Sequence, residues 1–344
     1  MLKTNNKLLS KKQWLIVISS FLIFLGIGYY LLFSPISYSI NEPLIFEIKK
    51  GESFSTVSEK LYQLGIVKNK FIFRIAAIIY GADNRIKAAR FKINNNLSYL
   101  DLIDLFTNGP ADYLKTIKIY KGSSLKNVVL TLQQELKIDS SRINKLAYDN
   151  NFLESLEINS NSLEGYLLPG VYDIYENSDA EEVIKIFIDS LKNFWSDSLQ
   201  NQSKILNLSK HQILTFASII EGETNYKEEM PIISAVYHNR LKKGMKLQAD
   251  PTIQYALDGG WRRLKYSDLS VDSPYNTYKY FGLPPGPINN PGKDAIIAAL
   301  YPAEVDYLFF VADGTGKHKF AKTYNEHLKN VRDYRKWLNS KKSE

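Results

Sequence analysis

The hydrophobic pattern opens with one long apolar segment near the N-terminus. Residues 14–33 carry no charge, and Ser19 and Ser20 are their only strongly polar members. Twenty helical residues rise about 30 Å, which is the hydrocarbon thickness of a bilayer. A cleavable signal peptide would have a shorter apolar region followed by a small-residue cleavage site. Because residues 29–33 are bulky, we expect an uncleaved transmembrane helix over residues 14–33.

A strand–helix pattern then occurs twice. Residues 44–48 predict a strand, and a turn with Gly51 leads into a helix that begins near Phe54. The same order recurs with a strand at 116–120, Gly122 and a helix from Leu125. Between the two copies, we expect a short strand at 91–93 and a helix capped by Ser98. Small strand–helix modules of this kind are typical of binding domains or of spacers rather than of catalytic domains. The pattern is therefore compatible with a binding module and with a simple stalk.

The second half of the chain contains a helix that is apolar nearly all round. Ser209 and Gln212 form a capping box at its start, and residues 213–220 are mostly apolar, so the helix should be buried. It ends at Glu221 and Glu223, which point to nearly opposite faces at about 100° per residue. Apolar surroundings and the negative end of a helix both raise the pKa of a carboxyl group. A carboxyl group with a raised pKa can act as a general acid that protonates a glycosidic oxygen. The same sequence is also compatible with two solvent-exposed glutamates at a frayed helix end.

Polar loops and further elements follow that helix. We expect a helix from Pro231 to Gly244, a helix at 294–300, a hairpin with strands at 307–311 and 318–320, and a closing helix at 325–338. The loops at 246–252, 273–278 and 282–288 are rich in proline, amides and tyrosine. Loops of this composition suit a sugar-binding site, and surface turns share the pattern.

Composition and charge narrow the function. The 344-residue chain has no cysteine and four histidines, so thiolate chemistry is excluded and neither a metal nor a cofactor is expected. The net charge is +8, and four lysines precede the apolar segment (Lys3, Lys7, Lys11 and Lys12). The first acid after that segment is Glu42, so the N-terminus should be cytoplasmic and the rest extracytoplasmic. This largely excludes nucleic acid and ATP as partners.

Several blocks together resemble the endolytic murein transglycosylases, the MltG or YceG-like family. They are 164–169, 217–224, 239–241, 247–252, 275–278, 282–286 and 311–314. Two positions depart from the family pattern: Gly222 stands where lysine is common, and residues 89–91 replace Gly-Thr-Tyr.

The resemblance implies an α+β protein with a single N-terminal transmembrane helix, a small LysM-like module and a larger mixed α+β catalytic domain. The boundaries expected are a cytoplasmic segment at 1–13, a transmembrane helix at 14–33, a LysM-like module at 42–110, a connecting segment at 111–163 and a catalytic domain at 164–340. The protein would lie in the cytoplasmic membrane, with its catalytic domain on the periplasmic or extracytoplasmic side. Penicillin-binding proteins of the elongation machinery are the protein partners that the resemblance implies.

The same resemblance implies cleavage between N-acetylmuramic acid and N-acetylglucosamine within nascent peptidoglycan strands, which limits strand length and leaves a 1,6-anhydromuramic end. The family's essential glutamate maps onto Glu223, and Glu221 is the second choice for the acid. The residues assigned to the substrate by the motif match are Gln248, Asp250, Asn276, Tyr278 and Glu221. Two alternatives stay open: a conventional muramidase with Asp250 as second carboxylate, and a non-enzymatic wall-binding scaffold.

Overall fold

The computed structural model describes residues 10–35, 43–257 and 262–342. Lys3, Lys7 and Glu42, with most of the predicted segment 1–13, lie outside the described residues. Within the described part the chain is mixed α+β, and its contacts divide it into two units, residues 1–115 and 116–344. Each unit has a hydrophobic core of its own.

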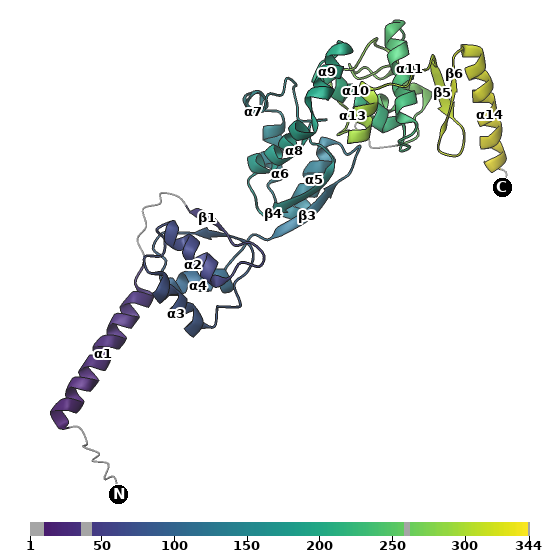
Figure 1. Ribbon diagram of the computed structural model, residues 1–344. Coiled ribbons are helices and arrows are strands. Elements are labelled where there is room, and N and C mark those ends of the chain that lie inside the picture. Colours follow the sequence, from purple (N-terminus) through teal and green to yellow (C-terminus); the bar gives the residue numbers. More distant parts are fainter. Residues whose placement is uncertain (1–9, 36–42, 258–261, 343–344) are drawn as a thin grey trace. The chain divides into compact units, whose positions relative to one another are not determined.

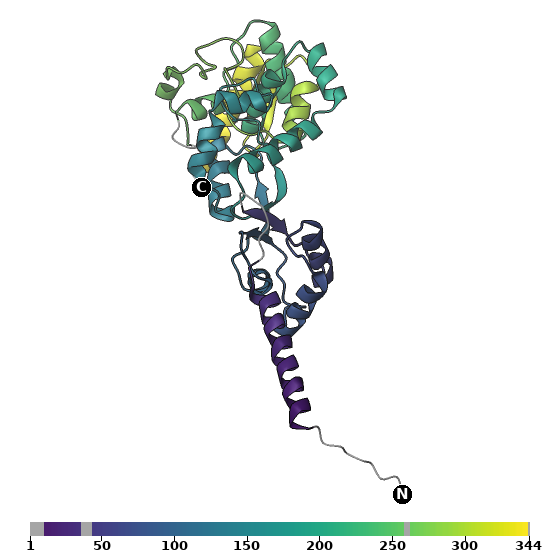
Figure 2. The same cartoon turned by 90° about the vertical axis from the view of Figure 1, so that its left-hand side faces the viewer.

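The first unit combines one long apolar helix with a small strand–helix body (Figure 1). Its elements are α1 (Lys11–Phe33), β1 (Leu44–Glu47), α2 (Phe54–Gln63), α3 (Lys70–Tyr80), β2 (Arg90–Ile93) and α4 (Tyr99–Thr107). Helix α1 is long and apolar enough over Lys11–Tyr30 to cross a membrane. It leaves the body as a straight helix in both views (Figures 1 and 2).

Strands β1 and β2 pair antiparallel, with Leu44 opposite Ile93 and Glu47 opposite Arg90. Helices α2, α3 and α4 close the core over this pair through Phe54, Phe73 and Phe106. The strand at 44–48 and the Ser98 cap are confirmed, and Ser98 forms a full capping box with Asp101. Helix α3 was not predicted from the sequence.

The second unit holds most of the helices. Strand β3 begins at the boundary between the units, and the elements in order are β3 (Leu114–Ile119), α5 (Leu125–Leu136), α6 (Ser140–Ala147), α7 (Asn150–Ser155), β4 (Gly170–Tyr175), α8 (Ala180–Phe194), α9 (Asp197–Ile205), α10 (Lys210–Glu223), α11 (Met230–Lys242), α12 (Asp250–Ala256), the 3-10 turn η1 (Tyr266–Ser270), α13 (Lys293–Leu300), β5 (Phe309–Ala312), β6 (His318–Ala321) and α14 (Tyr324–Lys342).

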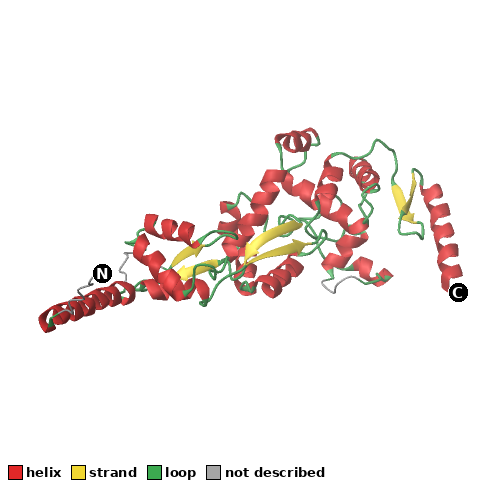
Figure 3. Cartoon of the chain, turned by 60° about the horizontal axis from the view of Figure 1, so that its bottom comes forward, coloured by secondary structure: helices red, strands yellow, loops and turns green. Residues whose placement is uncertain are grey.

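The strands of the second unit form two separate pairs, β3 with β4 and β5 with β6 (Figure 3). The β5–β6 hairpin is antiparallel, with Phe309 opposite Ala321, and α14 packs along it. The helix beginning near Pro231, the hairpin and the closing helix are confirmed as α11, β5–β6 and α14. The repeated strand–turn–helix pattern is confirmed too, because Gly51 and Gly122 both have positive φ and Ser53 and Ser124 both cap the following helix.

Helix α10 lies at the centre of the second unit. It packs against α9, α11, α12 and α13, and its residues 213–221 are all buried. The prediction of a buried helix is therefore confirmed. The surrounding helices hold both ends of α10 in place, and its C-terminal end carries the two candidate carboxylates.

Candidate active site

The start of α10 is held by its own sequence. The side chain of Ser209 accepts a hydrogen bond from the backbone N–H of Gln212 at 3.2 Å, and Gln212 accepts one from the backbone N–H of Ser209 at 2.8 Å. This is the predicted capping box. With its start capped and its sides buried, the helix delivers Glu221 and Glu223 to defined positions.

Glu221 contacts the start of another helix. Its Oε2 accepts a hydrogen bond from the backbone N–H of Gly292 at 3.0 Å, at the N-terminus of α13. Its Oε1 lies 3.5 Å from Nζ of Lys121, and the carboxylate is buried. A carboxylate at a helix N-terminus stabilises the unpaired N–H groups there. Glu221 therefore joins α10 to α13 and to the loop after β3.

Glu223 contacts a different neighbour, as its position two residues further along the helix predicts. Its half-buried carboxyl accepts a hydrogen bond from the hydroxyl of Tyr237 in α11. The pKa of Glu223 is raised to about 7, mainly because burial removes water from the carboxyl group. The hydrogen bond from Tyr237 and the charge of Arg240 lower this pKa, whereas the charge of Asp250 raises it further. A carboxyl group with this pKa is partly protonated at neutral pH, as a general acid requires.

Tyr237 and Arg240 lie on the face of α11 that borders Glu223. Burial, followed by the charge of Glu223, raises the pKa of Tyr237 well above its ordinary value, so its hydroxyl keeps its proton and acts as a donor. The buried guanidinium of Arg240 donates from Nε to the carbonyl of Leu308 at 2.7 Å and from Nη1 to the carbonyl of Leu247 at 2.6 Å. Arg240 thus supplies a positive charge near Glu223 and joins the segments before β5 and α12.

The segment around Gln248 and Asp250 is held by the loop around Thr277. The backbone N–H of Gln248 donates to the carbonyl of Thr277 at 3.1 Å, and that of Ala249 donates to the Thr277 hydroxyl at 2.9 Å. Gln248 has a positive φ of 52°, a left-handed backbone conformation that is uncommon outside glycine, and its side chain is exposed. Asp250 begins α12 and is exposed.

Tyr278 and Asp250 form a second hydrogen-bonded pair beside Glu223. The hydroxyl of Tyr278 donates to Oδ1 of Asp250 at 2.5 Å. Burial, then the hydrogen bond and charge of Asp250, raise the pKa of Tyr278, and the charge of Glu223 adds to this rise. Glu223, Asp250, Tyr278, Tyr237 and Arg240 therefore act on one another electrostatically.

Asn276 is fully buried, and its amide is used within the loop. Its Nδ2 donates to the carbonyls of Leu269 and Val271 at 3.0 and 2.8 Å, and its Oδ1 accepts from the backbone N–H of Tyr278 at 2.9 Å. The amide thus orders the loop that carries Tyr278. The predicted role of Asn276 in substrate binding stays a prediction, and in this structure its amide is hydrogen-bonded to backbone groups of its own loop.

Gly222 lies between the two glutamates and against the start of α12. A Cβ atom added to Gly222 would lie 2.7 Å from Cβ of Pro251, a distance that requires one of the two to move. The absence of a side chain therefore lets α12, which begins at Asp250, approach the end of α10. Gly222 departs from the family pattern, and its contact with Pro251 was not predicted from the sequence.

A hydrogen-bonded pair beyond the end of α10 was not predicted from the sequence. The carboxylate of Glu229 accepts hydrogen bonds from the backbone N–H and from Nδ1 of His318, both at 2.9 Å, and from the hydroxyl of Thr224 at 3.3 Å. These contacts connect the residue after Glu223 to strand β6. Glu229 and His318 are 89 residues apart, and no local pattern indicates such a contact.

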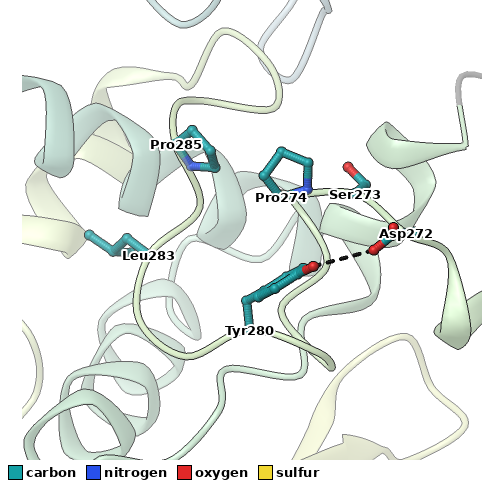
Figure 4. A pocket seen from close by; sticks show the side chains of 6 residues that line it. All are labelled: Asp272, Ser273, Pro274, Tyr280, Leu283 and Pro285. Carbon is teal, nitrogen blue, oxygen red and sulfur yellow. Dashed lines mark hydrogen bonds between the residues drawn. The ribbon is translucent and has the colours of Figure 1, made fainter.

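An open pocket of about 540 Å³ lies in the loop that contains Asn276 and Tyr278 (Figure 4). It is lined by Asp272, Ser273, Pro274, Tyr280, Leu283 and Pro285. Tyr280 donates a hydrogen bond to Asp272 across it at 3.2 Å. Across residues 10–35, 43–257 and 262–342, His, Asp and Glu side chains form no group of three that could hold a metal ion.

Known proteins support the resemblance noted from the sequence. The chain matches the YceG-like family over residues 46–333. The endolytic murein transglycosylase of Bacillus subtilis (strain 168) is 32% identical over 318 residues, covering 88% of each chain. That of Streptococcus pneumoniae (strain D39) is 31% identical and covers 94% of this chain, which spans 65% of the relative's length.

A solved structure supports the fold. The crystal structure of a yceG-like protein from Listeria monocytogenes matches with a TM-score of 0.60 and 31% identity, covering 84% of this chain and 99% of that one. The family match extends from β1 to the middle of α14 and so includes both units. The chain belongs to the YceG-like family.

Proposed function

We propose that the protein is an endolytic peptidoglycan lytic transglycosylase that cleaves the bond between N-acetylmuramic acid and N-acetylglucosamine within nascent strands. Two of its relatives are named endolytic murein transglycosylases. The observation that carries the proposal is the half-buried Glu223 at the end of α10, with a pKa of about 7 and a hydrogen bond from Tyr237. It is a carboxyl group able both to give and to take a proton near neutral pH.

Glu223 performs both proton transfers in this mechanism. Its protonated carboxyl donates a proton to the glycosidic oxygen, and the bond from that oxygen to C1 of muramic acid breaks. The carboxylate then takes the proton of the C6 hydroxyl, whose oxygen bonds to C1 and closes a 1,6-anhydro ring. Glu223 regains its proton and no water is consumed. A single carboxylate is sufficient, whereas glycoside hydrolases ordinarily need two.

The neighbours of Glu223 divide into groups that tune it and groups that meet the substrate. Tyr237 and Arg240 stabilise its ionised form, and Asp250 stabilises its protonated form. The exposed side chains of Gln248 and Asp250, and the half-buried Tyr278, are the proposed substrate contacts. Asn276 is proposed as a positioning residue, because its amide holds the Tyr278 backbone.

The 540 Å³ pocket offers a place for a sugar in the same loop that carries Asn276 and Tyr278. Tyrosine rings stack on sugar rings and carboxylates accept hydrogen bonds from hydroxyls, and the pocket contains both in Tyr280 and Asp272. We propose that glycan residues adjoining the cleaved bond occupy this pocket (Figure 4).

The remainder of the chain serves to bring the glycan to the membrane surface in this proposal. Helix α1 is the single-pass anchor, with the N-terminus cytoplasmic and both units outside the cytoplasmic membrane. Residues 42–110 act as a LysM-like module that holds glycan, which the separate core and the paired strands of the first unit support. Residues 111–163 connect it to a catalytic domain at 164–340. Elongation-phase penicillin-binding proteins remain the predicted partners.

The proposal is tested by digestion of uncross-linked glycan strands with the full chain in detergent. We expect internal cleavage by the parent protein and loss of cleavage in Glu223→Gln, with cleavage retained by Glu221→Gln as a matched control on the same helix. The reverse pattern would move the acid to Glu221. Cleavage by neither parent nor variants, with glycan binding retained, would favour the scaffold alternative.

A further inference from the structure

Helix α3 in the first unit has two apolar faces, and only one of them is covered. Phe73, Ala76 and Ala77 are buried in the core of the unit. The other face is a stripe of Phe71, Ile75, Ile78 and Ile79, whose exposed fractions are 70%, 40%, 63% and 76%. Their spacing of four, three and one residues places them on one side of the helix. An uncovered stripe of this kind marks a binding surface.

The stripe belongs to a helix that contacts the transmembrane candidate. Helix α1 contacts both α3 and α4, and Leu32 near the end of α1 packs against the core that contains Phe73. The apolar span of α1 ends at Tyr30. The contact thus lies at the end of the span, where tyrosine rings such as Tyr29 and Tyr30 favour the headgroup layer. If α1 crosses the membrane, α3 is at the depth of the lipid–water interface.

The charges on α3 suit the same surroundings. Its sequence from Lys70 to Tyr80 contains no acidic residue. Arg74 is exposed between Phe71 and Ile75, and Lys68 is exposed just before the helix. An apolar stripe flanked by cations is typical of a helix that lies in the plane of a membrane surface, where the stripe enters the acyl boundary and the cations meet anionic headgroups.

We propose that the face of α3 formed by Phe71, Ile75, Ile78 and Ile79 inserts into the leaflet from which α1 emerges, so that the first unit is attached to the bilayer at two points. The partner is an anionic lipid surface. The inference uses α1 as a membrane anchor and is independent of the chemistry at Glu223. Two attachments restrict the orientation of the unit on the membrane, which one helix alone does not.

The absence of cysteine from the chain permits a direct test. The full chain with Ile79→Cys is labelled with a fluorophore and reconstituted into vesicles of phosphatidylcholine and phosphatidylglycerol. Matched proteins carry the label at Phe24→Cys in α1 or at Ser55→Cys on the exposed side of α2. Brominated lipids should quench positions 79 and 24 severalfold more than position 55. The inference would be overturned if brominated lipid quenched the label at position 24 but aqueous iodide quenched the label at position 79 as strongly as the label at position 55. That result would leave the membrane anchor in place.

A second pair of variants tests the stripe itself. With the label at Ile75→Cys, the change Ile78→Glu should abolish lipid quenching because a carboxylate is costly to bury in the acyl boundary. Ile45→Glu, at an exposed position on β1, should leave the quenching unchanged. Protection of position 79 in native membranes but not in pure lipid vesicles would identify a protein partner instead and overturn the lipid proposal.

Discussion

The hydroxyl of Tyr237 donates a hydrogen bond to Oε1 of Glu223, joining the middle of one buried helix to the end of another. The bond stabilises the carboxylate, whereas loss of water and the charge of Asp250 stabilise the carboxylic acid. These opposing effects leave the pKa of Glu223 at about 7. A group that must donate a proton and then recover one is most effective at such a value.

The two neighbours predict opposite shifts in the pH dependence of activity. Cleavage requires protonated Glu223, so the rate of the parent should fall as pH rises through about 7. Tyr237→Phe removes a contact that lowers the pKa of Glu223, and the fall should move to higher pH. Asp250→Asn removes a charge that raises this pKa, and the fall should move to lower pH. Rates on short glycan oligomers across a pH series measure both shifts, and movement in the same direction would refute the assignment.

Removal of the Glu223 charge should also change stability in a pH-dependent way. The folded pKa of about 7 lies above the ordinary value of 4.5, so the contribution of Glu223 to stability is present below pH 4.5 and lost as pH rises through 7. Glu223→Gln does not ionise, and its stability relative to the parent should increase by about 3 kcal/mol between acid and alkaline pH. Thermal unfolding in detergent at both ends of this range measures the change. A constant difference would show that Glu223 is not perturbed in the folded protein.

Glu221 should matter for folding more than for chemistry. Glu221→Ala leaves the buried N–H of Gly292 without its acceptor, at a cost of about 1–3 kcal/mol. We expect a lower unfolding temperature and a product of unchanged type. Activity per folded molecule, measured below the unfolding temperature, should stay within severalfold of the parent. Complete loss of activity at unchanged stability would instead assign Glu221 a catalytic role.

A side chain at Gly222 should disturb the approach of α12 to α10. Alanine favours a helix over glycine by about 1 kcal/mol, but its Cβ would lie 2.7 Å from Cβ of Pro251. We expect Gly222→Ala to lower the rate, because Pro251 and the adjacent Asp250 must shift. Kinetics together with unfolding temperature distinguish the two effects. If the variant is more stable than the parent and cleaves at the same rate, Pro251 moves aside without displacing Asp250.

Local patterns in the sequence were sufficient to predict the elements whose caps and faces are encoded nearby. The capping box at Ser209, the cap at Ser98, the buried character of α10 and the β5–β6 hairpin all follow from residues within one element or turn. The divergence of Glu221 and Glu223 follows from helical geometry alone and is confirmed by their different partners.

Contacts between distant segments could not be predicted in this way. Asn276 stands in a loop of tyrosine, asparagine and threonine that reads as a binding surface, yet its amide is occupied by backbone groups. The Glu229–His318 pair and the Gly222–Pro251 contact depend on how α10, α12 and β6 pack. Tyr237 could likewise not be predicted as a partner of Glu223, because an apolar helix face that contains one tyrosine is typical of a hydrophobic core.

The chemical structure of the new muramic end, and whether its oxygen comes from water, tests the central claim most directly. The full chain is incubated with uncross-linked glycan in heavy-oxygen water, and the products are read by mass spectrometry. If Glu223 acts alone, the new muramic end is a 1,6-anhydro ring, one water lighter than a hydrolysed end, with no heavy oxygen incorporated and no product from Glu223→Gln. Reducing ends that carry the heavy oxygen would contradict this account and show a hydrolase that uses a second carboxylate, with Asp250 as the first candidate.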